Sequence, residues 1–128
     1  MWQLHAEKAE SALAKRAEFL GALALECGAE SFDRFTAALI FTELVGNVIR
    51  HADGPVDIQV RCIDGFAQIH VYDRGNGFEY RPQLPRDSLA EGGRGLYLIS
   101  QYSKRVSVQT FQRHGTCVSA VFALRKSA

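Results

Sequence analysis

The stretch of sequence that decides the fold is Thr36-Ala-Ala-Leu-Ile-Phe-Thr-Glu-Leu-Val-Gly-Asn-Val-Ile-Arg-His51. An α-helix advances by about 100° per residue, so Glu43, Asn47 and His51 lie above one another on one face, where Thr36 and Arg50 join them. Most of the remaining circumference is apolar, which predicts a buried helix. Buried polar groups need partners, so this stripe is either a set of side chains that satisfy one another or the floor of a polar cavity. The apolar positions expected around it are Phe35, Ala38, Phe41, Leu44, Val45, Val48 and Ile49.

The composition is that of one ordinary globular domain, residues 1–128. The chain is 47% hydrophobic and 23% charged, and its net charge of +1 gives no reason to expect a nucleic-acid partner. No apolar run reaches the roughly 18 residues needed to cross a bilayer, and the N-terminus lacks the order of a signal peptide. The widely spaced Cys27, Cys62 and Cys117 predict reduced core thiols in a cytoplasmic protein.

The region before the central helix predicts one strand and one long helix. Trp2–His5 is expected to form a short edge strand, and the Ala, Leu, Glu and Lys content from about Ala6 to Cys27 favours a helix. Ser31 or Asp33 can cap the central helix, which is expected to end near Ala52.

Alternating apolar and polar residues predict an antiparallel hairpin after the central helix. Its strands are Val56–Cys62 and Ala67–Tyr72, and Asp64-Gly65 between them is a strong hairpin signal. The same alternation turns Asp73 toward the interior at the end of the second strand. An inward carboxylate is costly to bury unless something there forms a hydrogen bond with it, so Asp73 is a second candidate site residue.

Two glycine-rich segments flank a long polar loop. Gly75 and Gly77 precede the loop at Phe78–Glu91, and Gly92-Gly93-Arg94-Gly95 follows it, before a helix expected from Leu96 to about Tyr102. A loop this long in a small domain is usually a lid or a binding loop. A glycine-rich turn that opens a helix suits a phosphate group, although tight turns alone would also explain the glycines. The two commoner phosphate motifs, G-x-x-x-x-G-K-[ST] and a strand followed by G-x-G-x-x-G, are absent.

Two further strands complete the pattern, at Val106–Thr110 and Thr116–Leu124. Antiparallel pairs with one apolar face, together with three helical segments, predict an α+β fold. We expect a two-layer α/β sandwich whose mixed, mostly antiparallel sheet carries the helices on one face.

These motifs, in this order, resemble the boxes of the GHKL (Bergerat-fold) ATPase superfamily. They are Glu43-x-x-x-Asn47-x-x-x-His51, Asp73-Arg-Gly75-Asn-Gly77, Gly92-Gly93-Arg94-Gly95-Leu96 and Gly115-Thr116, and the resemblance covers residues 32–124. The wording Glu-Leu-Val-Gly-Asn-Val-Ile-Arg-His-Ala and Gly-Gly-Arg-Gly-Leu-Tyr-Leu-Ile is most similar to the anti-sigma-factor serine/threonine kinases of bacterial partner-switching systems. Gly46 and Val48 depart from the Thr or Asn and the Ala usual beside the motif asparagine.

The resemblance implies ATP and Mg²⁺ as cofactors and gives each residue a role. Glu43 would be the general base, Asn47 would give its amide oxygen to Mg²⁺, and Asp73 would accept the adenine amino hydrogen. His51 is implied either as a nucleotide contact or as a structural residue. The other implied nucleotide contacts are Gly75 and Gly77 beside the base, Gly93, Arg94, Gly95 and Leu96 at the phosphates, and Thr116 at the base or its bound water.

The implied function is an ATP-dependent protein serine/threonine kinase that restrains a sigma factor and phosphorylates its antagonist, an anti-anti-sigma protein of the STAS type. Two alternatives remain: an ATP-binding partner-switch module without phosphoryl transfer, and an isolated histidine-kinase-type ATPase domain. Glu43 favours the kinase, because a pure binding module could lose it. No phosphorylatable histidine is expected upstream, since His5 lies too early. The resemblance allows a homodimer, with partner contact expected on the first helix near Arg16.

Overall fold

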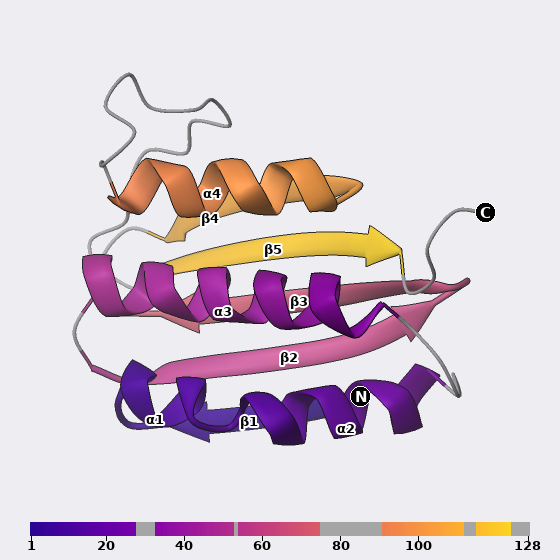
Figure 1. Cartoon of the computed structure of the whole chain (residues 1–128). Coiled ribbons are helices and arrows are strands. Elements are labelled where there is room, and N and C mark those ends of the chain that lie inside the picture. The colour runs from indigo at the N-terminus through magenta and orange to yellow at the C-terminus, as the bar shows by residue number, and fades with distance from the viewer. Residues whose placement is uncertain (28–32, 53, 75–90, 112–114, 124–128) are drawn as a thin grey trace.

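The computed structural model contains one sheet with helices on one side, which confirms the predicted two-layer α+β fold (Figure 1). It describes residues 1–27, 33–52, 54–74, 91–111 and 115–123, and only the backbone of His51 and of residues 91–96, 110 and 111. The elements in chain order are β1 (Trp2–Ala6), α1 (Ala9–Leu13), α2 (Arg16–Cys27), α3 (Arg34–His51), β2 (Val56–Ile63), β3 (Phe66–Asp73), α4 (Glu91–Tyr102), β4 (Arg105–Phe111) and β5 (Gly115–Ala123).

The sheet has the strand order β1-β2-β3-β5-β4. All four pairs of described strands are antiparallel, so the parallel pair that a mixed sheet would add is not found among them. Asp64 and Gly65 have positive φ angles of 51° and 83° and close the β2–β3 hairpin, as predicted. Because β5 returns to pair with β3, the end of β3 lies beside the start of β5.

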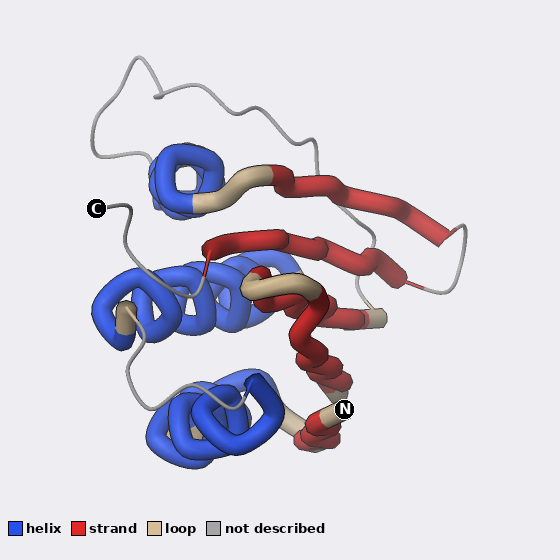
Figure 2. Tube along the Cα trace, turned by 90° about the vertical axis from the view of Figure 1, so that its right-hand side faces the viewer, coloured by secondary structure: helices blue, strands red, loops and turns tan. Residues whose placement is uncertain are grey.

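The core lies between α3 and the sheet, which Figure 2 shows with the helices on one side of the strands. Phe41 of α3 is fully buried and stacks on Phe19 of α2, with ring centroids 4.5 Å apart. The prediction of a buried central helix is therefore confirmed. Ala38 and Ile49 are only partly buried. Phe35 is 67% exposed and meets Tyr102, at the end of α4, edge-on, so its predicted burial is wrong. None of the described helices is long and apolar enough to span a membrane.

The long first helix predicted at Ala6–Cys27 is wrong, because the structure divides it into α1 and α2. A turn at Ala14 and Lys15 separates them, where the Lys15 N–H donates to the Ala12 carbonyl at 3.0 Å. The break lets α1 pack against α3 and β1, while α2 packs against β2 and α3. No glycine or proline marks the break, so tertiary packing has overridden local helix propensity here.

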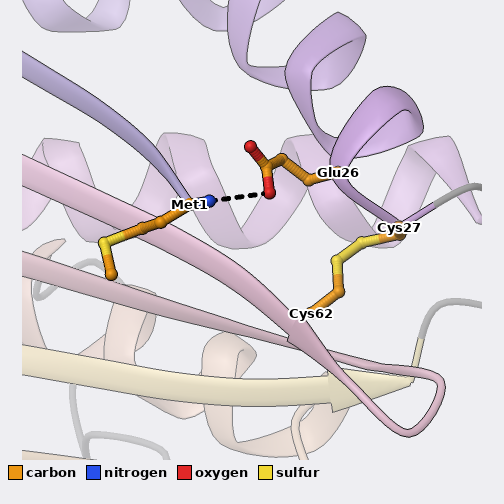
Figure 3. The surroundings of a disulfide bond; sticks show 4 residues. All are labelled: Met1, Glu26, Cys27 and Cys62. Carbon is orange, nitrogen blue, oxygen red and sulfur yellow. Dashed lines mark ion pairs between the residues drawn. A yellow bond between two sulfur atoms is a disulfide. The ribbon is translucent and has the colours of Figure 1, made fainter.

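Cys27 and Cys62 are joined by a disulfide, so the prediction of reduced thiols is wrong for this pair (Figure 3). Cys62 lies opposite Ala67 on the helix-facing side of the sheet, and α2 packs against β2, which brings together two residues 35 positions apart. Their Cα atoms are 5.4 Å apart, a usual separation for a disulfide. Cys117 is free and buried, as predicted, but it is paired with Tyr72 on the sheet face that points away from the helices.

α4 begins at Glu91, five residues before the predicted start at Leu96, so Gly92–Gly95 is helical and the prediction of a loop there is wrong. Glycine in a helix is less favourable than alanine by about 1 kcal/mol per residue, and this segment contains three. α4 packs against α3 and buries Ile99, and this packing offsets the poor propensity of the first turn.

Candidate functional site

The predicted site residues converge at one end of the sheet. Figure 1 shows the C-terminal end of α3, the end of β3, the start of β5 and the N-terminal end of α4 together on the left of the molecule. The antiparallel β3–β5 pairing and the return of the chain through α4 are sufficient to produce this arrangement. The topology therefore brings positions 43–51, 73, 91–96 and 116 to one region.

Asp73 and Thr116 lie directly opposite each other in the β3–β5 pair. Both are buried, with exposed fractions of 6% and 1%, and both are on the side of the sheet that faces α3. Among the described residues, the Thr116 Oγ1 atom has no hydrogen-bond partner. A buried hydroxyl of this kind is costly to leave unsatisfied, by about 1–3 kcal/mol, so Thr116 is a strong candidate for contact with a polar ligand.

Gly115 allows the two strands to approach at this point. Its φ angle is +103°, and a Cβ atom there would lie 1.7 Å from the Asp73 carbonyl oxygen and 2.7 Å from the Arg74 Cα. Only glycine fits so close to the end of β3. The sequence identified Gly115 as part of a motif with Thr116, but not its role in holding Asp73 beside Thr116.

Asn47 is the most deeply buried of the described polar side chains of α3, with none of its surface exposed. Arg50, one turn further on, donates a hydrogen bond from Nη2 to Asn47 Oδ1 at 2.9 Å. The other amide atom, Nδ2, is buried and lacks a hydrogen-bond partner in the part of the chain that the structure describes. The guanidinium lies over Gly46, where a Cβ atom would be 3.3 Å from Arg50 Nη1. The polar stripe is therefore only partly self-satisfied.

The other members of the stripe divide between the site and the start of the helix. Glu43 is half-buried one turn before Asn47. Thr36 belongs to the helix cap instead: its N–H and Oγ1 donate to the Asp33 carboxylate at 3.1 and 2.7 Å. The prediction that Asp33 can cap α3 is confirmed, and the partner of Thr36 is this cap and not another member of the stripe. His51 closes α3, but its side chain lies outside the described part.

The glycine-rich segments are described only in part. The backbone of Gly93, Arg94, Gly95 and Leu96 forms the first turns of α4, and their side chains lie outside the described part of the structure. Gly75 and Gly77, as well as the predicted lid at Phe78–Glu91 up to residue 90, also lie outside it. The start of α4 offers backbone N–H groups that have no partner within the helix, the usual binding groups for phosphate.

A metal ion at this site would have few protein ligands. In residues 1–27, 33–52, 54–74, 91–111 and 115–123, no group of three or more His, Cys, Asp or Glu side chains could hold a metal. Proteins often hold Mg²⁺ through one or two side-chain oxygens, and phosphate and water oxygens complete its coordination shell. A single amide oxygen from Asn47 fits that pattern, and a structural zinc site does not.

Two cavities lie near these residues. One of about 540 Å³ is beside the C-terminal end of α3 and is lined by Glu7, Lys8, Ala9, Glu10, Ile49, Ala52 and Gly54. The second, of about 340 Å³, reaches Asp73 and is lined by Asp57, Gln59, Tyr72, Asp73 and Arg74. The described lining of neither cavity includes Asn47 or Thr116.

The sheet face that points away from the described helices carries titratable groups that the predicted site does not use. His5 Nδ1 and Nε2 lie 2.6 and 2.8 Å from the carboxylates of Asp57 and Glu7, and its hydrogen bonds, first to Glu7 and then to Asp57, raise the pKa of His5 above 6.5. Burial lowers the pKa of His70 and raises the pKa of the Cys117 thiol. Burial thus favours the neutral forms of both groups, and a neutral thiol does not suit a cysteine nucleophile.

Comparisons with known proteins agree with this fold and order of motifs. A sequence profile of the family described as "Histidine kinase-like ATPase domain" matches residues 6–122. No curated protein matches the chain. The catalytic domain of the histidine kinase ThkA superposes with a TM-score of 0.58 at 9% identity, covering 99% of this chain and all of that one.

Two longer histidine kinases share the fold. The Acinetobacter baumannii histidine kinase AdeS has a TM-score of 0.54 at 14% identity, over 98% of this chain and 70% of that one. The Erythrobacter litoralis EL346 blue-light activated histidine kinase has a TM-score of 0.54 at 19% identity, over 91% of this chain and 42% of that one. Such low identities show the fold alone. The profile match covers nearly the whole chain, and the chain therefore belongs to the family of histidine kinase-like ATPase domains.

Proposed function

We propose that the chain binds ATP with Mg²⁺ at the end of the sheet where α3, α4, β3 and β5 meet. The observation that carries this proposal is the pair of buried, facing residues Asp73 and Thr116, the second without a partner among the described residues. Adenine offers an amino donor, whereas guanine has a carbonyl in the same position. An ionised carboxylate accepts hydrogen bonds and cannot donate them, so Asp73 would select adenine.

The phosphates belong at the start of α4 in this proposal. Its first N–H groups have no partner within the helix, and the helix dipole favours negative charge at that end. Gly93, Gly95 and Leu96 would contribute backbone groups and Arg94 a positive charge. Asn47 would hold Mg²⁺, which neutralises phosphate charge when it is bound. His51 would be either a nucleotide contact or a structural residue. Gly75 and Gly77 would lie beside the base.

We further propose protein serine/threonine kinase activity, with Glu43 as the general base. Glu43 is half-buried and one helical turn from Asn47, so a hydroxyl from a partner protein can reach it. The carboxylate would take the hydroxyl proton as the serine or threonine oxygen forms a bond to the γ-phosphorus. The bond to the β-phosphate oxygen breaks in the same displacement, and ADP leaves.

The proposed acceptor is the STAS-type antagonist of a sigma factor, and the proposed regulatory role is that of a cytoplasmic anti-sigma factor. The similarity of the motif wording to partner-switching kinases supports this choice. The partner surface is proposed on α2, where Arg16 donates to Thr42 of α3 at 3.3 Å and Leu25 is 86% exposed. A homodimer through this region is an alternative use of the same surface.

A histidine acceptor is the second candidate, because the structural relatives named above are histidine kinases. Both chemistries would use the same nucleotide site. They differ in the acceptor and in the stability of the product, since phosphoserine and phosphothreonine survive acid, whereas phosphohistidine does not.

One experiment separates these candidates. The chain is incubated with labelled ATP, Mg²⁺ and two sets of acceptors: candidate antagonist domains and histidine-containing dimerisation domains. The Glu43→Ala variant should transfer phosphate about 10²–10⁴ times more slowly, with its nucleotide affinity unchanged. Asp64→Asn, which removes an exposed carboxylate in the β2–β3 hairpin at the opposite end of β3 from Asp73, should transfer at the wild-type rate.

Each outcome decides between the proposals. Acid-stable product on an antagonist supports the serine/threonine kinase, and acid-labile product on a dimerisation domain supports the histidine kinase. Equal transfer by wild type and Glu43→Ala contradicts the general-base role. ATP binding without transfer to any acceptor leaves a nucleotide-gated binding module as the better account.

A further inference from the structure

We infer that Arg50 is a latch on Asn47: its guanidinium is hydrogen-bonded to the amide oxygen that Mg²⁺ would use, so that the metal binds more readily when Arg50 moves away. This inference rests on the proposed nucleotide site. It adds a residue that positions the magnesium ligand and sets how readily the metal enters.

The hydrogen bond fixes the orientation of the Asn47 amide. A guanidinium has donors and no acceptor, so the atom that faces Arg50 Nη2 at 2.9 Å must be the amide oxygen. The other end, Nδ2, is buried and has no acceptor among the described residues. The hydrogen bond from Arg50 is therefore the contact that fixes how the Asn47 amide is turned.

The Arg50 guanidinium and a magnesium ion would compete for the same amide oxygen. Mg²⁺ would need to approach that oxygen to about 2.1 Å, and the guanidinium already uses one of its two lone pairs. A dication and a guanidinium that shared one oxygen would repel each other strongly. If the amide turned over instead, its N–H groups would face the N–H groups of Arg50. Release of Arg50 relieves both conflicts.

Gly46 makes room for the latch. A Cβ atom at this position would lie 3.3 Å from Arg50 Nη1 and 3.8 Å from Nη2, so any larger side chain would crowd the guanidinium. Gly46 is also the position at which the sequence departs from the Thr or Asn usual in the motif. The glycine that departs from the motif thus leaves the space that the Arg50 guanidinium fills.

The test measures the Mg²⁺ concentration that half-saturates the increase in ADP affinity, together with ADP affinity in EDTA. Arg50→Met removes the latch, and the half-saturating Mg²⁺ concentration should fall by about three- to thirty-fold, the effect of one hydrogen bond to a charged group at a partly exposed site. Gly46→Thr should also lower the half-saturating Mg²⁺ concentration, although it keeps the charge of Arg50. Arg61→Met, which removes an exposed arginine bonded to Gln68, should leave it unchanged.

A second readout uses no nucleotide. The Asn47 side-chain amide signals in the NMR spectrum of the free protein should shift in Arg50→Met and stay in place in Arg61→Met. Normal ADP binding with unmoved Asn47 signals, or with an unchanged magnesium requirement in both Arg50→Met and Gly46→Thr, overturns the latch alone. Loss of ADP affinity in EDTA in Arg50→Met also overturns it, since Arg50 would then be a phosphate contact. If wild type binds no nucleotide with or without Mg²⁺, the proposed site is wrong and the latch falls with it.

Discussion

Replacing Gly115 with alanine would place a methyl group inside the backbone of β3. The new Cβ atom would lie 1.7 Å from the Asp73 carbonyl oxygen, so the end of β3 would have to retreat by more than an ångström. The positive φ angle of +103° adds backbone strain. Gly65→Ala is the matched control, because Gly65 also has a positive φ angle, +83°, but a Cβ atom there would meet nothing within 4 Å.

The two variants separate the backbone strain of a positive φ angle from the displacement of the end of β3. Gly65→Ala should lower the free energy of unfolding by about 1–2 kcal/mol, the strain of a left-handed backbone. Gly115→Ala should lose that amount and about 1–3 kcal/mol more from overpacking. A chain of this length loses roughly 3–5 °C in Tm for each kcal/mol, so calorimetry or circular dichroism resolves the difference.

The variants should differ more in ATP binding than in stability. Gly65 lies in the hairpin at the opposite end of β3 from Asp73, so Gly65→Ala should keep wild-type ATP affinity. Gly115→Ala moves Asp73 relative to Thr116 and should lose ATP affinity by about tenfold or more, the effect of one mispaired hydrogen bond. Normal ATP affinity in a folded Gly115→Ala protein, or equal losses in both variants, would refute the close-approach role of Gly115.

Other changes test the packing and charges of the fold. Cys62→Ser removes the Cys27–Cys62 link across 35 positions and should lower the unfolding free energy by up to about 4 kcal/mol, seen as a lower urea midpoint; an unchanged midpoint contradicts the bond. Two carboxylates raise the pKa of His5 above 6.5, so its stabilising contribution, complete below the pKa of the unfolded chain, should be lost as pH rises through the folded pKa. A Tm difference between wild type and His5→Gln that does not shrink with rising pH argues against it. Phe41→Ala should cost about 3–5 kcal/mol of unfolding free energy and Phe35→Ala much less, since the first is fully buried and the second is 67% exposed; equal losses would be inconsistent with this packing.

The parts of the fold that the sequence predicted well are those with strict alternation or a strong turn signal. The β2–β3 hairpin and the inward direction of Asp73 both follow from period-two patterning, because one residue of slip would reverse every side chain. The burial of α3 follows from its apolar circumference. Each of these inferences depends on residues close together in the sequence.

The errors arose where distant packing decides the outcome. Nothing local marks the break at Ala14, and the glycines before Leu96 locally favour a turn. The packing of α1 and of α4 against α3 decides both outcomes. The Cys27–Cys62 pair depends on α2 crossing β2. The burial of Asn47 follows from the apolar circumference of α3, but the hydrogen bond that Arg50 donates to it has no signal in the sequence.

The central claim is an adenine nucleotide site built around Asp73, and calorimetric titration of ATP and GTP in the presence of Mg²⁺ tests it most directly. The account predicts that ATP binds to wild type and GTP binds at least about tenfold more weakly, because guanine lacks the amino donor that a carboxylate accepts. Asp73→Asn should lose about 1–3 kcal/mol of ATP binding free energy. Asp57→Asn, on the outward face of the sheet, should bind as wild type does. Equal affinity for ATP and GTP, or wild-type ATP affinity in Asp73→Asn, would contradict the account.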